Sequence, residues 1–334
     1  MTVWTVRAHA RLACCLLDMT GDRGRVDGTL GIGLQEPFVE VVAAPHDRLE
    51  FDADHDVADA IRAGVGLAER IARGPMRVKL SLLSWIRPHV GLGHKTQTVL
   101  AAAAAALSAS QVPYSMRGLV RESGRGGTSG AGVHTFLGGG VVLDGGHRFG
   151  SGGKTTFGPS SRMLDVGPPP LIARVEPPDE LRVVIASPIG IEGASGDDEA
   201  QFFAQHFPLG RADTDALIAD VVMRLIPAII EGDYVQIGAG IDAIQLSTFK
   251  RGIWAAQAAP ILFARERLRR AGVSVGLSSM GSTMYSIVGA TDAATVVGLY
   301  RDELTRLGVD AVVHATSVSQ RGACVSSSAS GPLE

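Results

Sequence analysis

The stretch "RPHVGLGHKTQTVLAAAAAAL" (residues 87–107) predicts the end of a strand, a glycine loop and the first turns of a helix. Such a loop exposes backbone N–H groups beside the positive end of a helix dipole, which favours phosphate. A glycine pair can also simply end a strand, but the lysine and threonine at the helix start favour an anion site. The residues predicted to hold a phosphate group are Gly91, Gly93, His94, Lys95, Thr96 and Gln97.

Hydrophobic periodicity around this loop predicts a mixed α+β chain. The helix after the loop, residues 97–109, is rich in alanine, which has the highest helix propensity. Strands are predicted at residues 2–17, 38–44, 76–86, 181–187, 273–279, 284–289 and 310–318, and a turn-rich stretch at 19–34 leads into another. Further helices are predicted at residues 54–73, 213–231 with a kink at Pro227, 233–247, 255–271 and 292–307.

The proline-rich segment at residues 166–180 predicts an extended connector, because proline disfavours helix before it. We therefore expect a first domain over residues 1–175 and a second over 176–330. The strands and helices of the second domain suit an α+β layer with helices on one face. The last residues, 326–334, are expected to form a mobile tail.

The composition is that of an ordinary globular protein, 46% hydrophobic with a net charge of −3. With 5% aromatic residues and no basic run, no nucleic-acid partner is expected. No apolar run approaches the roughly 20 residues of a membrane span and no signal peptide is recognised, so we expect a cytoplasmic protein without a membrane partner. Cys14, Cys15 and Cys324 show no disulfide or metal-ligand spacing, and the first two are expected in the core.

A second glycine-rich stretch covers residues 121–156, where glycines allow positive φ and close approach of the backbone to a ligand. Apolar segments run through it, which argues against the alternative of a flexible linker. Gly153-Lys154-Thr155 is not a P-loop, because Arg148 stands where that pattern needs glycine. Arginine offers a planar fork for phosphate or carboxylate. The ligand-binding residues predicted here are Arg125, Gly126, Gly127, Thr128, Ser129, Asp144 and Lys154.

Asp27 and His147 are the candidate catalytic residues. Histidine can serve as acid, base or ligand near neutral pH, although a lone histidine is often structural. Asp27 follows Arg25, a candidate binding residue, and the Asp27-Gly28 pair is also typical of a hairpin turn. In the C-terminal half, small residues between two strands predict an anion-binding nest made of Ser278, Ser279 and Gly281.

These motifs, in this order, resemble the GHMP kinase superfamily. "GLGHKT" (91–96) stands where that superfamily has its phosphate loop, and "GLSSMGSTMYSIV" (276–288) resembles its C-terminal glycine motif. The chain resembles more closely the β-ribofuranosylaminobenzene 5′-phosphate synthases, a non-kinase branch. That likeness is carried by "GRVDGTLGIGLQEP" (24–37), "HVGLGHKTQ" (89–97), "GRGGTSGAGVHTF" (124–136), "VVLDGGH" (141–147) and "FGPSSRMLDVGPPPLIAR" (157–174).

The resemblance implies a two-domain GHMP-kinase-like fold, with a ribosomal protein S5 domain 2-like N-terminal domain, a ferredoxin-like C-terminal domain and the site between them. It also implies a reaction without phosphoryl transfer. Phosphoribosyl pyrophosphate is joined to an aromatic carboxylic acid through a C–C bond at ribose C1, with release of pyrophosphate and CO2. Mg2+ is the expected cofactor and a homodimer the expected assembly. Asp27 and His147 would then orient ribose hydroxyls or handle a proton, and Lys154 would pair with a carboxylate.

One departure from the family pattern concerns His94-Lys95, because these synthases tend to have a small Ser-Gly pair after "GLG". The departure implies an altered grip on pyrophosphate or a site for a second acceptor carboxylate. It favours a similarity to the C-ribosyl synthases of formycin and pyrazofurin biosynthesis, whose acceptor resembles an aminopyrazole dicarboxylic acid. Three alternatives stay open: a synthase for a 4-substituted benzoate, a small-molecule GHMP kinase, and a non-catalytic ligand-binding relative. The kinase would need a Mg2+-binding serine where His94-Lys95 stands.

Overall fold

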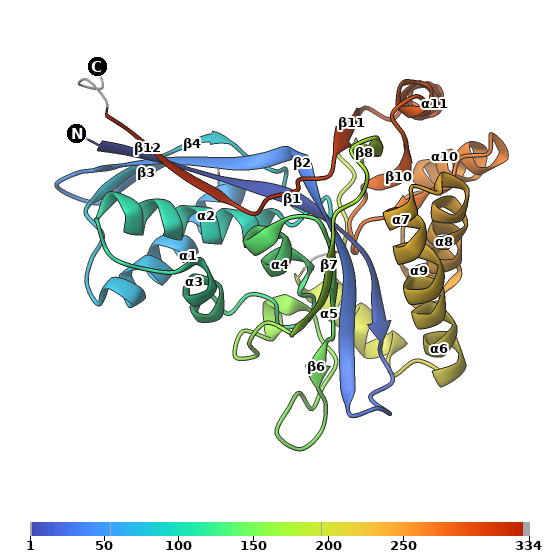
Figure 1. Ribbon diagram of the computed structural model, residues 1–334, viewed down its shortest axis with the longest axis horizontal. Helices are drawn as coiled ribbons and strands as arrows, with labels where there is room; N and C mark the ends of the chain where they lie inside the picture. Colours follow the sequence, from blue (N-terminus) through green and yellow to red (C-terminus); the bar gives the residue numbers. More distant parts are fainter. Residues whose placement is uncertain (1, 54, 195, 330–334) are drawn as a thin grey trace.

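A computed structural model describes residues 2–53, 55–194 and 196–329, and in it two β-sheets each carry their own helices (Figure 1). The first sheet has the order β12 (Cys324–Ala329), β1 (Thr2–Asp18), β2 (Arg25–Pro45), β4 (Val78–Ser84), β3 (Glu50–Asp52). Its shorter strands are β5 (Val141–Asp144), which pairs with β2 and with β7 (Leu171–Val175), and β6 (His147–Arg148), which pairs with β2. All pairs are antiparallel except β3 with β4.

Four helices cover one face of the first sheet (Figure 1). They are α1 (His55–Ala72), α2 (His94–Ala109), α3 (Met116–Glu122) and α4 (Ala131–Gly138). The alanines at residues 101–106 of α2 are fully buried, because this helix lies between α1 and the strands. Their small side chains allow close packing, and a Cβ added to Gly64 of α1 would lie 2.6 Å from the Val99 carbonyl oxygen. The alanine run therefore fixes how near the sheet the start of α2 lies.

The second sheet is antiparallel, in the order β11 (Ala311–Ser317), β8 (Leu181–Pro188), β10 (Met284–Gly289), β9 (Gly276–Leu277). The helices between its strands are α5 (Gly196–His206), α6 (Arg211–Asp220), α7 (Ile226–Glu231), α8 (Tyr234–Leu246), α9 (Thr248–Ala255), α10 (Ala259–Arg270) and α11 (Ala293–Arg306). The first sheet takes in strands up to β7, and the second begins at β8. β12 then returns to the first sheet beside β1 (Figure 1).

Several predicted boundaries are wrong. The two strands predicted around residues 19–34 and 38–44 are one continuous strand, β2. The helix predicted at 255–271 begins only at Ala259, as α10, and α9 (Thr248–Ala255) was not predicted. The prediction of a mobile tail is wrong for residues 326–329, because they pair with β1. Residues 330–334 lie outside the described residues. The kinked helix at 213–231 contains a π-helical segment, Val221–Leu225, directly before Pro227.

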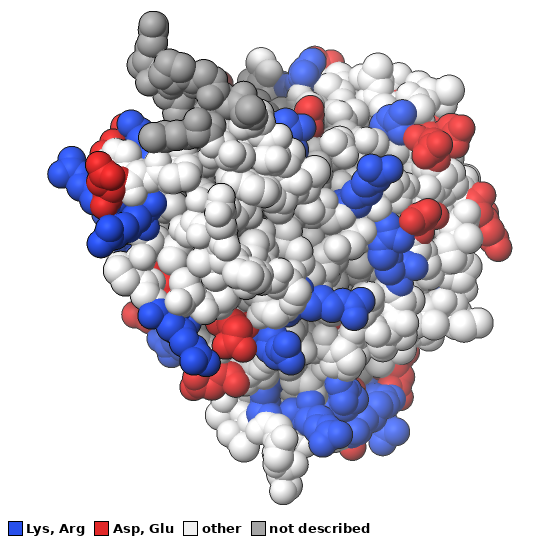
Figure 2. All heavy atoms as spheres, turned by 60° about the vertical axis from the view of Figure 1, so that its left-hand side comes forward, with Lys and Arg blue, Asp and Glu red and all other residues white. Residues whose placement is uncertain are grey.

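The surface carries both signs of charge. Over most of the face drawn in Figure 2, Lys and Arg side chains are interspersed with Asp and Glu. Within the part of the chain that the structure describes, no helix is both long and apolar enough to cross a membrane. Cys14 and Cys15 are buried on β1 as free thiols, which confirms their place in the core.

Candidate active site

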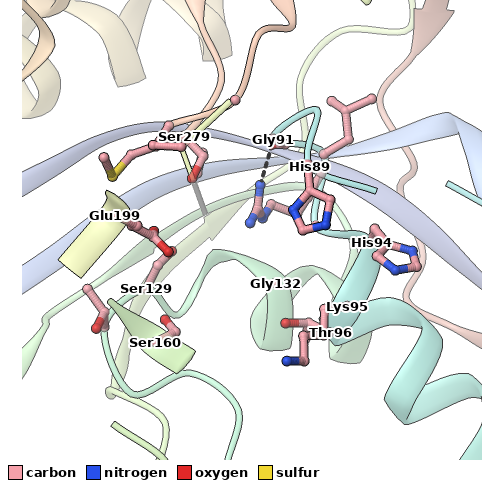
Figure 3. A pocket seen from close by; sticks show the side chains of 18 of the residues that line it. His89, Gly91, His94, Lys95, Thr96, Ser129, Gly132, Ser160, Glu199 and Ser279 are labelled. Carbon is pink, nitrogen blue, oxygen red and sulfur yellow. Dashed lines mark hydrogen bonds between the residues drawn. The ribbon is translucent and has the colours of Figure 1, made fainter. Parts of the chain in front are cut away.

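A pocket of about 670 Å³ lies between the two sheet systems, and loops from both line it (Figure 3). The start of α2 and the loop before α4 form one side, whereas α5, α9 and the loop after β9 form the other. Figure 3 shows His89 and His94 across the pocket from Glu199. Of the predicted site residues, those on the pocket wall are Gly91, Gly93, His94, Lys95, Thr96, Arg125, Gly126, Thr128, Ser129, Ser279 and Gly281.

The start of α2 presents unsatisfied backbone donors to this pocket. Gly91 and Gly93 both adopt left-handed conformations, with φ of 87° and 84°, which turn the chain into the helix. No side chain caps the helix start and no acidic residue lies in its first turn, so its first N–H groups are available to an anion. Gln97 is the exception among the residues predicted here, because it is buried and donates to the Gly132 carbonyl at 2.9 Å.

The predicted anion nest of the C-terminal half packs directly on the first glycine loop. Ser278 is fully buried, and its hydroxyl donates to the Gly91 carbonyl at 2.8 Å and accepts from the Ala13 N–H at 3.2 Å. A Cβ added to Gly91 would lie 2.3 Å from the Ser278 carbonyl oxygen, and one on Gly281 would lie 2.3 Å from the Gly91 nitrogen. Ser278 therefore joins the two loops, and Ser279 and Gly281 face the pocket.

The loop that precedes α4 supplies an arginine and two hydroxyls. The Arg125 side chain reaches α2, where its Nε donates to the Thr96 hydroxyl at 3.1 Å. Burial lowers the pKa of Arg125, and the carboxylate of Glu199 opposes that shift. The Thr128 hydroxyl donates to the Gly158 carbonyl at 2.6 Å. Gly127 does not line the pocket and allows close packing, since a Cβ there would lie 2.1 Å from the Met163 carbonyl oxygen.

The sequence analysis missed five charged residues of the pocket wall: Arg11, Asp59, Arg87, Glu199 and Lys250. Arg11 follows a register shift in the pairing of β1 with β2, and such irregularities redirect a side chain. Its Nη1 donates to the Gly91 carbonyl at 2.7 Å, the dashed bond in Figure 3. Burial and the neighbouring Arg125 lower the pKa of Arg11 to about 10. A charge within the apolar sequence of residues 8–17 was the available signal.

Glu199 lies on α5 in electrostatic contact with two arginines. Burial raises the pKa of its carboxyl group to about 7, although Arg11 and Arg125 both act in the opposite direction. At neutral pH this group is therefore close to half protonated. No sequence motif marks it, because α5 itself was not predicted.

The two candidate catalytic residues lie away from the pocket wall. β6 pairs with β2 so that His147 stands opposite Val26, next to Asp27. Oδ2 of Asp27 is 2.6 Å from Nδ1 of His147 and 2.8 Å from Nζ of Lys154. Lys154 also donates to the Gly127 carbonyl at 3.0 Å. Asp27, His147 and Lys154 are all buried, and we call them the buried triad.

Arg25 and Asp144 also have structural contacts instead of positions on the pocket wall. Arg25 donates to the carbonyl oxygens of Gly145 and Gly146 at 2.7 and 2.6 Å. Asp144 accepts from the N–H groups of Gly130 and Gly146, both at 2.9 Å. Burial nevertheless raises the pKa of Asp144 to about 7, because these hydrogen bonds offset only part of the desolvation. Gly130 directly precedes α4, so Asp144 fixes the end of the loop that carries Arg125.

The Asp27-Gly28 pair is not the hairpin turn between β1 and β2. That turn occupies residues 19–24, and the pair lies inside β2 with φ of 69° and 75°. This backbone turns Asp27 toward β6 and makes the buried triad possible.

The arrangement of two sheets that each carry their own helices matches that of solved GHMP kinases. Homoserine kinase from Cytophaga hutchinsonii superposes with a TM-score of 0.69 at 15% identity, covering 97% of each chain. Phosphomevalonate kinase from Streptococcus pneumoniae gives a TM-score of 0.67 at 11% identity, covering 96% of this chain and all of that one. These likenesses confirm the predicted α+β, GHMP-kinase-like fold.

Sequence comparison identifies the family within that fold. The chain is 34% identical over 291 residues to β-ribofuranosylphenol 5′-phosphate synthase from Methanothermobacter thermautotrophicus, covering 84% of this chain and 88% of that one. It is 31% identical over 321 residues to the Archaeoglobus fulgidus synthase of the same name, covering 95% and 97%. No family model matches the sequence. The chain belongs to the β-ribofuranosylphenol 5′-phosphate synthase family, and the predicted enzyme branch is confirmed.

Proposed function

We propose that this chain joins phosphoribosyl pyrophosphate to an aromatic carboxylic acid, forming a C–C bond at ribose C1 and releasing pyrophosphate and CO2. The observation that carries the proposal is the pocket itself. It combines the uncapped start of α2 with five cationic side chains, a set that suits a strongly anionic substrate. The five are Arg11, Arg87, Lys95, Arg125 and Lys250. The name of the family, which gives a ribosylated phenol 5′-phosphate as the product, supports ribosyl transfer to an aromatic ring.

Pyrophosphate departure is the step for which this lining is best suited. As the bond from C1 to the pyrophosphate oxygen breaks, negative charge grows on the leaving group. The first-turn N–H groups of α2, Lys95 and Arg125 lie on one side of the pocket and would hold that charge. His94 and Lys95 stand where the resemblance implies a small pair, and both line the pocket at the start of α2.

The acceptor supplies the electrons for the new bond. Its ring carbon attacks C1, and the electron pair of the C–CO2⁻ bond then returns to the ring as CO2 leaves. The balance needs no external proton, oxidant or reductant. What it needs from the protein is a held orientation of ring and ribose. Asp27 and His147 stay predictions as catalytic residues, since they lie beneath the Arg125 loop instead of on the pocket wall.

Mg2+ fits the pocket as a companion of the pyrophosphate. Among the described residues no group of three or more His, Cys, Asp or Glu side chains forms a metal cluster. Mg2+ is usually held by one or two carboxylates together with substrate phosphates. Glu199 is a carboxylate on the pocket wall beside two arginines and would contribute to that set. The ion would neutralise part of the pyrophosphate charge.

We further propose a heteroaromatic acceptor of the aminopyrazole dicarboxylate type, because the pocket offers more cations than one pyrophosphate needs. A 4-substituted benzoate is the second candidate. The relatives are named for a ribosylated phenol, and decarboxylative synthesis of such a phenol requires a hydroxybenzoate. Both candidates share the donor and the bond that forms.

The test is pyrophosphate release from phosphoribosyl pyrophosphate and Mg2+, with each acceptor offered separately and products weighed by mass spectrometry. We expect release with 4-aminopyrazole-3,5-dicarboxylate and a product lacking one CO2. Turnover of 4-hydroxybenzoate or 4-aminobenzoate alone would transfer the protein to the benzoate reaction. Phosphate transfer from ATP, or no release with any acceptor, would overturn the proposal. Chelation with EDTA should stop release, and added Mg2+ should restore it.

A further inference from the structure

The pocket has an apolar half, whose residues are not among those predicted to hold phosphate. Ala13, Cys15 and Leu16 from β1, Phe203 from α5, and Met280 line it. Leu16, Phe203 and Met280 belong to one apolar cluster, so these walls are contiguous. An apolar, water-poor wall of this kind suits the faces of a planar ring.

One cation lies in this apolar half. Lys250 is fully buried, and its Nζ donates to the carbonyl oxygens of Leu277 at 2.5 Å and Ser279 at 3.2 Å. An ammonium group has three N–H donors, so one remains, and Lys250 lines the pocket. The titratable groups that influence its pKa are Cys14, Cys15 and Arg11, and none of them is a carboxylate.

A buried charge without a counter-charge is costly unless it serves a ligand. Burial lowers the pKa of Lys250 to about 8, so the group is still mainly an ammonium at pH 7. A bound anion would stabilise the ammonium charge in place of the water that burial removes. The start of α2 and Arg125 provide for phosphate on the other side of the pocket, which leaves the anion of the ring itself for Lys250.

A carboxylate can leave as CO2 only if its charge moves into the ring. A fixed cation on that carboxylate stabilises the charge before it moves and so opposes its loss. Two carbonyl groups hold the Lys250 ammonium in place, so it cannot move away from a carboxylate that it binds. Its geometry therefore suits a carboxylate that stays on the ring.

We propose that Lys250 binds a carboxylate that the aromatic acceptor keeps through the reaction, which makes it the residue that selects a dicarboxylate over a monocarboxylate ring. This inference rests on the proposed function and names the acceptor class more closely. Phe203 and Met280 would hold the ring faces beside it.

The test compares Lys250→Gln with the wild type, using 4-aminopyrazole-3,5-dicarboxylate and 4-aminopyrazole-3-carboxylate. Glutamine keeps N–H donors but removes the charge. We expect the kcat/KM preference for the dicarboxylate to fall about 10- to 100-fold, as for a lost hydrogen bond to a charged group. The KM for phosphoribosyl pyrophosphate should not change. Lys79→Gln is the matched control, because Lys79 is half-exposed and pairs with Glu50 far from the pocket wall.

Equal losses for both acceptors would mean that Lys250 holds the departing carboxylate, and an unchanged preference would mean that it holds neither; both overturn the inference. Calorimetric binding of the dicarboxylate in the presence of pyrophosphate measures the same preference without turnover. It therefore separates failure of this inference from failure of the proposed reaction. If the variant does not fold, a crystal structure of the wild type with both ligands decides. A carboxylate on Lys250 Nζ supports the inference, and a carboxylate placed elsewhere overturns it.

Discussion

The pocket and the buried triad are both built from charged side chains beside glycine-rich loops, yet they differ in what their charges contact. In the triad, Asp27 contacts both His147 and Lys154, and no member is more than 6% exposed. In the pocket, Arg11, Arg125 and Glu199 influence one another electrostatically but form no ion pair within 4 Å among the described residues. The charged groups of the triad therefore contact one another, whereas those of the pocket are placed to contact a ligand.

The difference shows what glycine does in each place. At Gly91 and Gly93 the positive φ values direct backbone donors into a cavity. At Gly28 a positive φ lies within β2, where pairing with β6 brings Asp27 and His147 together. Because Lys154 also holds the Gly127 carbonyl, the triad supports the loop that carries Arg125. We therefore expect the triad to stabilise the structure and the pocket to bind the substrate.

Asp27→Asn should give the largest effect, and it tests most directly whether the triad is structural and not catalytic. The substitution leaves the Lys154 ammonium buried without its carboxylate, so we expect the free energy of unfolding to fall by about 3–5 kcal/mol. Chemical denaturation measures it, with Asp302→Asn on the exposed side of α11 as the control. Wild-type stability combined with a lost kcat would instead restore Asp27 as a catalytic residue.

Gly91→Ala addresses the contact between the two glycine loops. A methyl group there meets the Ser278 carbonyl oxygen at 2.3 Å and forces a side chain into a left-handed conformation. We expect a loss of about 2–4 kcal/mol in unfolding free energy together with weaker pyrophosphate binding. Gly298→Ala on α11 is the control, because nothing lies within 4 Å of its added Cβ. Equal melting temperatures for the two variants would show that the loops do not need this close approach.

Arg125→Met should act on binding with little effect on folding. The side chain makes a single hydrogen bond, to Thr96, so the fold loses little when it is removed. A phosphate group that it binds loses a charged partner, and we expect the KM for phosphoribosyl pyrophosphate to rise about 10- to 100-fold. Arg121→Met on the exposed end of α3 should leave it unchanged. If both variants behave alike, Arg125 is not part of the phosphate site.

Local sequence patterns were sufficient for the part of the site that one segment builds. The loop at residues 91–96 carries its glycines, its cation and its helix start within six residues, and the structure places all of them together. The alanine-rich helix, the three longest strands of the first sheet and the four strands of the second were predictable for the same reason, because periodicity and propensity act over short distances.

The rest of the site depends on contacts between distant segments. Arg11 reaches the pocket through an irregularity in β1, and Lys250 reaches it because α9 packs under the loop after β9. The only local sign of Arg11 is a charge within an apolar strand, and Lys250 has no local sign. Asp27 and His147 lie off the pocket wall although their glycine-rich surroundings resemble a binding loop, because strand pairing turns them inward. Their catalytic role stays a prediction.

Glu199→Gln should give the smallest effect and concerns pH. The folded pKa of Glu199 is raised to about 7, so the folded protein keeps a proton that the unfolded chain has lost. Its ionisation therefore costs stability, and that cost grows as pH rises from about 4.5 to about 7. An anion bound in the pocket is repelled by the same carboxylate once that group has ionised.

Between pH 6 and pH 8, in the absence of Mg2+, the affinity of the wild type for inorganic pyrophosphate should therefore fall more steeply than that of Glu199→Gln. The difference between the two proteins should be less than about tenfold. Calorimetric titration measures both affinities, and the ionisation of pyrophosphate itself drops out because it affects both proteins equally. Parallel pH profiles of the two proteins would show that Glu199 does not lie near the bound pyrophosphate. The pyrophosphate would then bind elsewhere in the pocket than beside Arg11 and Arg125.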